Sequence, residues 1–365
     1  MGKVNLYRME TTNGLKKYFT KQLMTWHETE NERSLPWKQE KDPYKIWLSE
    51  IILQQTRAQQ GLPYYIKFTT TYPTISDMAN AADEEVFRIW QGLGYYNRCK
   101  NMLATARLIA REYGGVFPVD YDGILALKGV GPYTAAAIAS FAYDLPHAVV
   151  DGNVYRVLAR YFGIAEPSDT TKGKKQFQEL AQELLDTTDS AGYNQAIMDL
   201  GATVCTPKVP ACQRCPLQEH CVALRQDTIS LLPVKSKKLI VKERYFHYLL
   251  LNCGEKIWIQ KRGHKDIWEN LYEPLLVEHD RELDKTSFEN HEIIKALGVR
   301  DKIEYAGSHS QRLTHRIIKT SFFVLQGDKV IDMPGNEGMW VTRDALKNFA
   351  FPKTVIHFLE KNLYF

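Results

Sequence analysis

Four cysteines between positions 205 and 221 constrain this chain more than any other feature of its sequence. They are spaced C-x6-C-x2-C-x5-C, as Cys205, Cys212, Cys215 and Cys221, and prolines interrupt the run. Zinc sites usually place cysteines in two close pairs, whereas this uneven spacing suits four thiolates that wrap a [4Fe–4S] cluster. The segment therefore predicts a [4Fe–4S] cluster. The alternatives are a zinc ion, or cysteines that simply pack as small apolar side chains.

Length and composition indicate a soluble protein of two domains. A chain of 365 residues exceeds one average domain, and 44% hydrophobic with 25% charged residues is typical of globular proteins. There is no long apolar run and no signal-peptide pattern, and six cysteines, four of them clustered, fit a reducing compartment. We therefore expect a monomer in the cytoplasm, associated with the nucleoid if bacterial, with no membrane partner. Cys99 and Cys253 are expected to be ordinary packed residues.

The net charge of +4 is concentrated in one short stretch of the chain. Residues 231–244, LLPVKSKKLIVKER, hold five basic side chains against the single acidic Glu243, so their excess of four equals that of the whole protein. Such a run is most often a solvated linker. It could also lie along a polyanion, where neutralised phosphates supply affinity without regard to sequence.

The spacing of apolar residues changes at this basic stretch. Residues 10–225 show apolar positions at helical spacing, separated by proline and glycine, whereas from 245 onward short β-rich runs dominate, with one helical stretch near 286–297. We therefore expect an all-α domain over 1–228, with the cysteine segment 205–221 at its end. A basic linker over 229–244 and a mixed α/β domain over 245–365 should follow.

Residues 125–140, LALKGVGPYTAAAIAS, read as a helix, a tight Gly-Val-Gly turn and a second helix that begins near Pro132. Gly129 and Gly131 leave backbone N–H groups bare at a helix N-terminus, where they can meet a phosphate. The pattern, over 123–140, is that of a helix–hairpin–helix DNA-binding element. An αα-hairpin that only packs is the alternative.

Two carboxylates are candidates for catalysis. Glu50 lies in a helical run with Ile46, Trp47 and Leu53 on its face, and loss of hydration there would raise its pKa and make it a proton donor. A partly exposed glutamate at a helix edge is the plainer interpretation. Asp151 precedes an amphipathic helix, so it could serve as an ordinary N-cap as well as in chemistry.

These motifs together resemble the endonuclease III superfamily of DNA glycosylases. Within it, LPW (35–37), SEIILQQTR (49–57), GLGYYNR (92–98) and GVGPYTAAA (129–137) resemble the adenine DNA glycosylase family, MutY. The resemblance is dense over 35–221 and weaker beyond. It implies a helix–hairpin–helix glycosylase domain with an iron–sulfur segment and a C-terminal Nudix-like domain.

The resemblance also implies roles for particular residues. Catalysis would fall to Glu50, Asp151, Tyr133 and Asn153. Contacts to the substrate and to DNA would come from Leu35, Trp37, Gln55, Thr56, Leu93, Tyr95, Gly129 and Gly131. Bifunctional relatives carry a lysine at position 133, whose amine forms a Schiff base with the sugar and permits strand cleavage. A tyrosine there implies a monofunctional enzyme that leaves an abasic site.

The C-terminal domain of this family reads 8-oxoguanine, the damaged partner base. Its recognition loop commonly reads Phe-Ser-His, and at the aligned place this chain has Leu313-Thr314-His315. The hydroxyl and the histidine are retained, but an aromatic contact is lost. A surface strand histidine is the plainer interpretation of His315. No Nudix hydrolase signature is present, so we do not expect nucleotide hydrolysis.

The sequence therefore predicts a monofunctional adenine DNA glycosylase of base excision repair. Its substrate would be duplex DNA in which adenine is mispaired with 8-oxoguanine or guanine. One rival is another glycosylase of the superfamily, such as a thymine-specific enzyme. The other is a non-enzymatic iron–sulfur protein that binds DNA, which would have no need of both Glu50 and Asp151.

Overall fold

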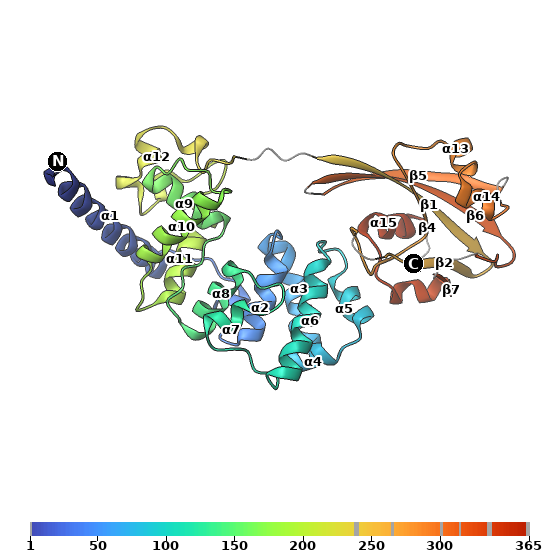
Figure 1. Cartoon of the computed structure of the whole chain (residues 1–365), viewed down its shortest axis with the longest axis horizontal. Coiled ribbons are helices and arrows are strands. Elements are labelled where there is room, and N and C mark those ends of the chain that lie inside the picture. Colours follow the sequence, from blue (N-terminus) through green and yellow to red (C-terminus); the bar gives the residue numbers. More distant parts are fainter. Residues whose placement is uncertain are drawn as a thin grey trace. The chain divides into compact units, whose positions relative to one another are not determined.

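The computed structural model describes residues 2–236, 241–263, 266–299, 302–313, 315–333 and 338–362, with side chains from position 14 onward. The chain forms two compact units (Figure 1). One comprises Met1–Ala79 and Ala104–Lys238, and the other comprises Asn80–Leu103 and Leu239–Phe365. Each has a hydrophobic core of its own.

The first unit is helical, as the spacing of apolar residues predicted. Its longer helices are α1 (Gly2–Thr29), α2 (Pro43–Leu53), α3 (Ala58–Thr71), α4 (Ile75–Asn80), α7 (Tyr121–Leu125), α8 (Pro132–Tyr143), α9 (Gly152–Phe162), α10 (Thr171–Leu184) and α11 (Ser190–Thr203). Short turns of helix follow at η2 (Cys212–Arg214), η3 (Gln218–His220), α12 (Val222–Arg225) and η4 (Ile229–Leu231), while η1 (Pro36–Lys38) precedes α2. Several helices begin at an aspartate whose side chain accepts a backbone N–H, among them α2, α7, α9 and α11.

One core of the first unit joins α1, α9, α10 and α11. Phe19 and Leu23 of α1 are fully buried with Leu158 of α9 and Leu200 of α11. Three of the clustered cysteines pack against this core as partly buried side chains. The core thereby connects the cysteine segment to the helix that begins next to Asp151.

The helix–hairpin–helix element is formed by α7 and α8. The sequence pattern predicted that the first helix runs through Lys128, which is wrong: α7 ends at Leu125, and Lys128 lies in the turn. Its carbonyl accepts a hydrogen bond from Thr105 Oγ1 at 2.7 Å. Gly129, in the same turn, has φ 78°, a left-handed conformation that favours glycine. The second helix begins at Pro132, as predicted.

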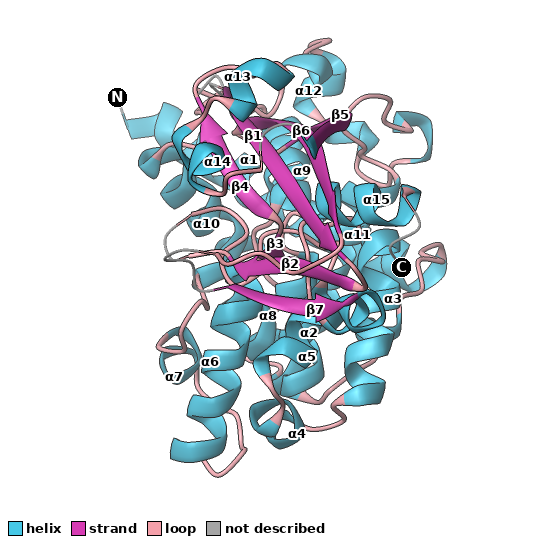
Figure 2. Cartoon of the chain, turned by 90° about the vertical axis from the view of Figure 1, so that its right-hand side faces the viewer, coloured by secondary structure: helices cyan, strands magenta, loops and turns pink. Residues whose placement is uncertain are grey.

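The second unit is built on one seven-stranded mixed sheet (Figure 2). The strands are β1 (Lys242–Cys253), β2 (Lys256–Lys261), β3 (Tyr272–Glu273), β4 (Leu275–His279), β5 (Ile303–Arg312), β6 (Arg316–Gly327) and β7 (Gly338–Thr342). Their order is β3-β2-β1-β6-β5, with β4 paired to β1 and β7 to β2. The pairing of β1 with β6 is parallel and the others are antiparallel. The apolar run of β1 suits this central position, because both of its faces are covered.

Helices complete the second unit: α13 (Lys285–Glu289), α14 (Glu292–Ala296), η6 (Arg343–Asn348) and α15 (Lys353–Lys361), together with α5 (Asp83–Trp90) and the first part of α6 (Asn97–Glu112). The loop after α5 joins the unit through Gln91, whose side-chain oxygen accepts the Phe351 N–H at 3.1 Å. In the part of the chain that the structure describes, no helix is long and apolar enough to span a bilayer.

Candidate active site

A cavity of about 600 Å³ opens in the first unit between α2, α8, α9, α11 and the segment around η1. It gathers residues that lie far apart in the sequence. Eight of the predicted site residues line it: Leu35, Trp37, Glu50, Gln55, Thr56, Tyr133, Asp151 and Asn153. The size suits a ligand the size of a single nucleobase with its sugar.

Glu50 is the buried carboxyl of this cavity. It lies in the middle of α2, and only 6% of its surface is exposed, so it is not a glutamate at an exposed helix edge. Its pKa is raised to about 7, chiefly by burial and also by the negative charge of Asp151, while a hydrogen bond from the Tyr133 hydroxyl acts in the opposite direction. Glu50 therefore holds its proton near neutral pH and can donate it.

Asp151 is both a helix cap and a cavity residue. Its Oδ1 accepts the backbone N–H groups of Asn153 and Val154 at 2.8 Å each, which makes it the N-cap of α9. Its Oδ2 accepts the Asn153 side-chain amide at 2.7 Å. Burial raises the pKa of Asp151, while these three donors lower it. The N-cap interpretation is confirmed, and the capping aspartate also lines the cavity.

Arg156, which the sequence analysis did not identify, orients the Asn153 side chain by a hydrogen bond to its amide oxygen. Its Nη2 donates to Asn153 Oδ1 at 2.8 Å and to the Gly201 carbonyl at 2.6 Å, and its Nε donates to the Cys205 carbonyl at 2.7 Å. Gly201 permits the close crossing of α9 and α11, because a Cβ there would lie 2.6 Å from Asn153 Cβ. The only available signal was a charged residue on the apolar face of a helix.

Asp199 of α11 is a second residue that the sequence analysis did not identify. It is 1% exposed and lines the cavity. Its carboxylate accepts hydrogen bonds from Asn31 Nδ2 and Arg33 Nη1, each at 2.7 Å, and from Lys38 Nζ. A buried carboxylate with two cationic partners fixes the segment that carries them.

That segment carries Leu35 and Trp37 to the cavity wall. Trp37 packs edge-on against Tyr65, with ring centroids 5.3 Å apart. Gln195, on α11 one turn before Asp199, donates from Nε2 to the Lys38 carbonyl at 2.8 Å. The apolar wall of the cavity is therefore held in place by polar contacts to α11.

Gln55 and Tyr95, predicted to contact the substrate or the DNA, each have a left-handed backbone. Gln55 follows α2 with φ 55°, and Tyr95 follows α5 with φ 49°. Tyr95 is 44% exposed, whereas the neighbouring Leu93 is buried. Such backbone strain at exposed residues is typical of functional loops.

In the hairpin, Gly129 is exposed and Gly131 is the N-cap of α8, with open space where a Cβ would point. Backbone N–H groups at the start of α8 can therefore be approached closely by another molecule. Neither glycine is among the described residues that line the cavity.

The four clustered cysteines line one small cavity together with Arg160. Arg160 Nη1 lies 3.5 Å from Cys205 Sγ and donates to the Thr206 carbonyl at 2.8 Å. Among the described residues, no three His, Cys, Asp or Glu side chains are arranged as ligands of a single metal ion. Four thiols around a shared space, with a cation beside one of them, fit the donor set of an iron–sulfur cluster.

His315, one of the two predicted base-reading residues, lies in the turn between β5 and β6. His315 is exposed, and its carbonyl accepts the Lys242 N–H at 3.1 Å. The turn is closed by the Leu313 N–H, which donates to the Arg316 carbonyl at 2.7 Å. Thr314 lies outside the described residues.

Comparison with known proteins identifies both units. Residues 48–186 match the HhH-GPD superfamily of base excision DNA repair proteins, and residues 247–361 match the NUDIX domain. Adenine DNA glycosylase of Buchnera aphidicola subsp. Schizaphis graminum is 34% identical over 254 residues, which are 70% of this chain and 73% of that protein. The human adenine DNA glycosylase is 41% identical over 214 residues, 56% of this chain and 39% of that protein.

Solved structures resemble the helical part. A thermostable thymine-DNA glycosylase is similar with a TM-score of 0.55 and 32% identity, over 59% of this chain and 99% of that one. A trapped complex of endonuclease III with DNA has a TM-score of 0.51 and 19% identity, over 58% of this chain and 96% of that one, and indicates a shared fold.

Proposed function

Because the chain belongs to the adenine DNA glycosylase family, we propose that it removes adenine mispaired with 8-oxoguanine or guanine. It would do so by hydrolysis of the N-glycosidic bond. The observation that carries this proposal is that two carboxyl groups with different surroundings line the same cavity. Glu50 has a pKa near 7, and Asp151 accepts three hydrogen bonds. Two carboxyls in different environments can act as acid and as anion in the same reaction.

Glu50 acts as the general acid. The target adenine has to leave the base stack before its glycosidic bond can be reached, and the cavity is large enough to receive it. Protonation of the base at N7 by Glu50 makes it a better leaving group, so the bond from C1′ to N9 breaks with the electron pair on the base. Tyr133 holds the acid in place through its hydroxyl.

Asp151 supports the sugar after the base departs. Positive charge develops at C1′ as the bond breaks, and the ionised carboxylate of Asp151 opposes it electrostatically or by transient covalent capture. Water then supplies a hydroxyl to C1′ and loses a proton, which leaves an abasic site. Asn153 keeps the carboxylate in one orientation through its two hydrogen bonds.

The enzyme is monofunctional in this proposal, because no amine occupies position 133. A Schiff base with the sugar requires a lysine nitrogen, and the Tyr133 phenol cannot form one. Burial and the two nearby carboxyls hold the pKa of Tyr133 well above its usual value, so it stays a neutral hydrogen-bond donor.

Other residues of the site bind the substrate. Leu35 and Trp37 form the apolar wall against the adenine, and Gln55 and Thr56 border the same cavity. Tyr95 is the candidate wedge at the opposite base, since exposed aromatic side chains can hold a base step open. The start of α8, with Gly129 and Gly131 before it, would receive a backbone phosphate. Leu93, which is buried, would support its loop rather than touch DNA.

The four cysteines would hold a [4Fe–4S] cluster. Their shared cavity supports this assignment. When bound, such a cluster joins thiolates from the end of the helical domain and so stabilises its loops. Cys205, with Arg160 beside its sulfur, would bind one side of the cluster. The exposed loop that follows Cys205 would present Lys208 to the DNA backbone.

The NUDIX domain would read the partner base. His315 offers an imidazole in the turn between β5 and β6, and Thr314, which precedes it in the sequence, offers a hydroxyl; either group can hydrogen-bond the edge of an oxidised guanine. His315 is exposed, as such a contact requires. Leu313 replaces the aromatic residue common in the family, so the preference for 8-oxoguanine over guanine should be moderate.

A base-release assay tests this function. Duplexes with adenine opposite 8-oxoguanine, guanine, cytosine or thymine, and a duplex with thymine opposite guanine, are incubated with excess full-length protein. Adenine release opposite 8-oxoguanine and guanine alone is expected. Release of thymine would favour the rival suggested by the thymine-DNA glycosylase similarity, and release of no base would favour a non-enzymatic iron–sulfur protein.

A further inference from the structure

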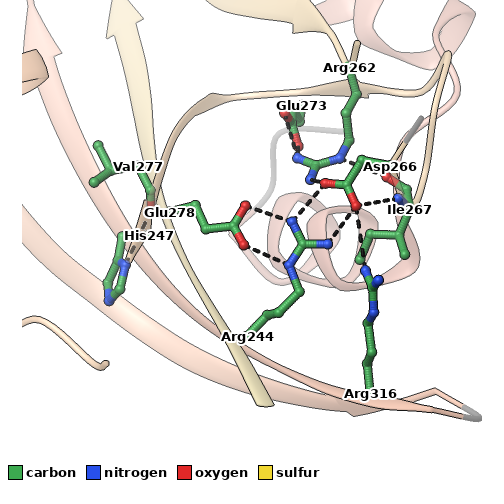
Figure 3. Close-up of polar contacts among 9 residues, drawn as sticks. All are labelled: Arg244, His247, Arg262, Asp266, Ile267, Glu273, Val277, Glu278 and Arg316. Atoms are coloured by element: carbon green, nitrogen blue, oxygen red, sulfur yellow. Dashed lines mark hydrogen bonds and ion pairs between the residues drawn. The ribbon is translucent and has the colours of Figure 1, made fainter. Parts of the chain in front are cut away.

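A network of arginines and carboxylates surrounds Asp266 in the second unit, and one of its members, Arg316, directly follows His315 in the chain (Figure 3). Arg244 of β1, Arg262 after β2 and Arg316 of β6 all reach the carboxylate of Asp266. We infer that Asp266 is a positioning residue that holds His315 in the orientation needed to read the partner base. This inference rests on the proposed function, in which His315 contacts that base.

Asp266 is the centre of the network. Its Oδ1 accepts hydrogen bonds from Arg244 Nη1 at 2.5 Å and from the backbone N–H of the next residue, Ile267, at 2.7 Å. Its Oδ2 accepts Arg244 Nη2 at 2.7 Å and Arg262 Nη2 at 2.6 Å. These donors hold the pKa of Asp266 far below its usual range, so it is ionised at every pH at which the protein would act. Charge-assisted hydrogen bonds of this kind are short and directional.

Arg316 connects this centre to the turn. Its Nη1 lies 3.5 Å from Asp266 Oδ1, and its backbone carbonyl accepts the Leu313 N–H that closes the turn. His315 is the residue directly before it. A shift of the Arg316 side chain therefore moves the backbone that carries the imidazole.

A second connection runs through β1. The His315 carbonyl accepts the Lys242 N–H at 3.1 Å, and Arg244, two residues along the same strand, holds Asp266 with two nitrogens. The Asp266 carboxylate is thus connected to His315 in two ways, through the next residue, Arg316, and through the neighbouring strand β1. Glu278 also binds Arg244, and Glu273 binds Arg262, but in the described part of the chain neither of them contacts Arg316, so Asp266 is the carboxylate that connects to both sides of His315.

The arginines that bind Asp266 are themselves firmly held. The Arg262 side chain is 7% exposed, and its Nη1 binds both oxygens of Glu273, at 3.0 and 2.9 Å. Its guanidinium lies over the Phe246 ring at 4.8 Å, and that of Arg244 lies over the same ring at 4.9 Å. Asp266 is therefore fixed relative to the sheet, which a positioning residue has to be.

The test compares two rates in the same enzyme preparation. Adenine release from duplexes with 8-oxoguanine and with guanine is measured under single-turnover conditions with saturating full-length protein, and the ratio of the two rates is the readout. The fraction of folded enzyme cancels in this ratio. For Asp266→Asn we expect the ratio to fall about threefold to tenfold, as coupling within one ion-pair network allows.

Three matched variants make the result specific. Asp266→Glu keeps the charge and should restore part of the ratio. Glu278→Gln removes a partner of Arg244 but leaves the contact between Asp266 and Arg316, so its ratio should stay near that of the unchanged protein. Arg316→Gln should repeat the loss, and its side chain is 40% exposed, so the fold should tolerate it if Asp266→Asn proves unstable.

His315→Ala distinguishes the positioning role of Asp266 from the reading role of His315 itself. If His315→Ala lowers the ratio and neither Asp266→Asn nor Arg316→Gln does, the positioning role is overturned while the proposed function stands. An unchanged ratio in His315→Ala itself would overturn the assignment of His315 as reader. In the His315→Ala background, Asp266→Asn should have no further effect, and an undiminished effect there would also overturn the inference.

Discussion

Asn153 binds Asp151 from both of its ends. Its backbone N–H donates to Oδ1 at 2.8 Å and its side-chain amide to Oδ2 at 2.7 Å. With the Val154 N–H, the carboxylate has three donors and one available orientation, whereas Glu50 has the Tyr133 hydroxyl. Donors favour the ionised form, so this difference in number supports the proposal that Asp151 acts as the anion and Glu50 as the acid.

Glu50→Gln should bind mispaired duplex but release no adenine. The glutamine keeps the size of the side chain and can still accept the Tyr133 hydrogen bond, but it has no proton to donate. Binding is measured by titration of labelled duplex, and release by single-turnover cleavage of the resulting abasic strand. Turnover near that of the unchanged protein would rule out Glu50 as the acid.

The same variant should be more stable than the unchanged protein at neutral and alkaline pH. Burial raises the pKa of Glu50 from about 4.5 to about 7, so the folded state retains a proton that the unfolded state has lost. The free energy of unfolding therefore decreases as the pH rises from about 4.5 to about 7, by about 3 kcal/mol at most. Urea titrations should show equal stabilities near pH 4 and a gap that widens to pH 8.

The rate of adenine release should fall as the pH rises through about 7. Glu50 has to be protonated to act, and its pKa lies there in the free protein. At low pH the rate should fall again when Asp151, whose pKa burial also raises, takes up a proton. Single-turnover rates from pH 4 to pH 9 on saturating enzyme give the profile. A rate that continues to increase to pH 9 would contradict an acid at position 50.

Asp199→Asn should destabilise the helical unit and slow adenine release. Loss of the buried charge leaves Arg33 and Lys38 without a carboxylate, at a cost of about 2 kcal/mol. Glu183→Gln, which breaks the more exposed pair with Lys16, is the control and should cost under about 0.5 kcal/mol. Urea unfolding gives the energies. Equal effects of the two substitutions would show that Asp199 does not hold the cavity wall.

Cys212→Ser should lose iron and weaken DNA binding more than the chemical step. A missing thiolate leaves the cluster with three cysteines and loosens the loops around it. Iron content, visible absorbance and duplex affinity are measured, with Cys253→Ala, which changes a buried cysteine of the second unit, as control. If Cys212→Ser retained a full complement of iron, the four-cysteine site would be wrong.

Tyr133→Lys should gain some ability to cut the strand at the abasic site. The new amine would lie at the cavity, where it can form an imine with the opened sugar. Borohydride trapping on duplex DNA detects that imine, and Tyr133→Phe serves as the control without an amine. Trapping by the unchanged protein would overturn the monofunctional assignment.

Local features of the site were predictable from sequence. The N-cap position of Asp151 depends on the few residues after it, and the burial of Glu50 depends on apolar neighbours along one helix. The helical first domain and the strands β1, β2, β6 and β7 also follow from apolar spacing. Each of these features is determined by residues close together in the chain.

Other features depend on contacts across the fold. Asp199 lies more than 160 positions from Arg33 and Lys38, so no local pattern pairs them. Strand β5 was not predicted, because most of its side chains are exposed and it lacks alternating apolar residues. The network around Asp266 likewise joins β1, β6 and the residue after β2 through side chains that look like ordinary surface charges in the sequence.

The left-handed backbones at Gln55 and Tyr95 have a consequence for protein engineering. A side chain in this conformation costs about 1 kcal/mol that glycine would not, so selection for heat resistance alone would favour glycine at both positions. Such variants would tolerate higher temperature while losing the side chains that we propose contact the DNA. A search for a thermostable form of this enzyme should therefore hold these two positions constant from the start.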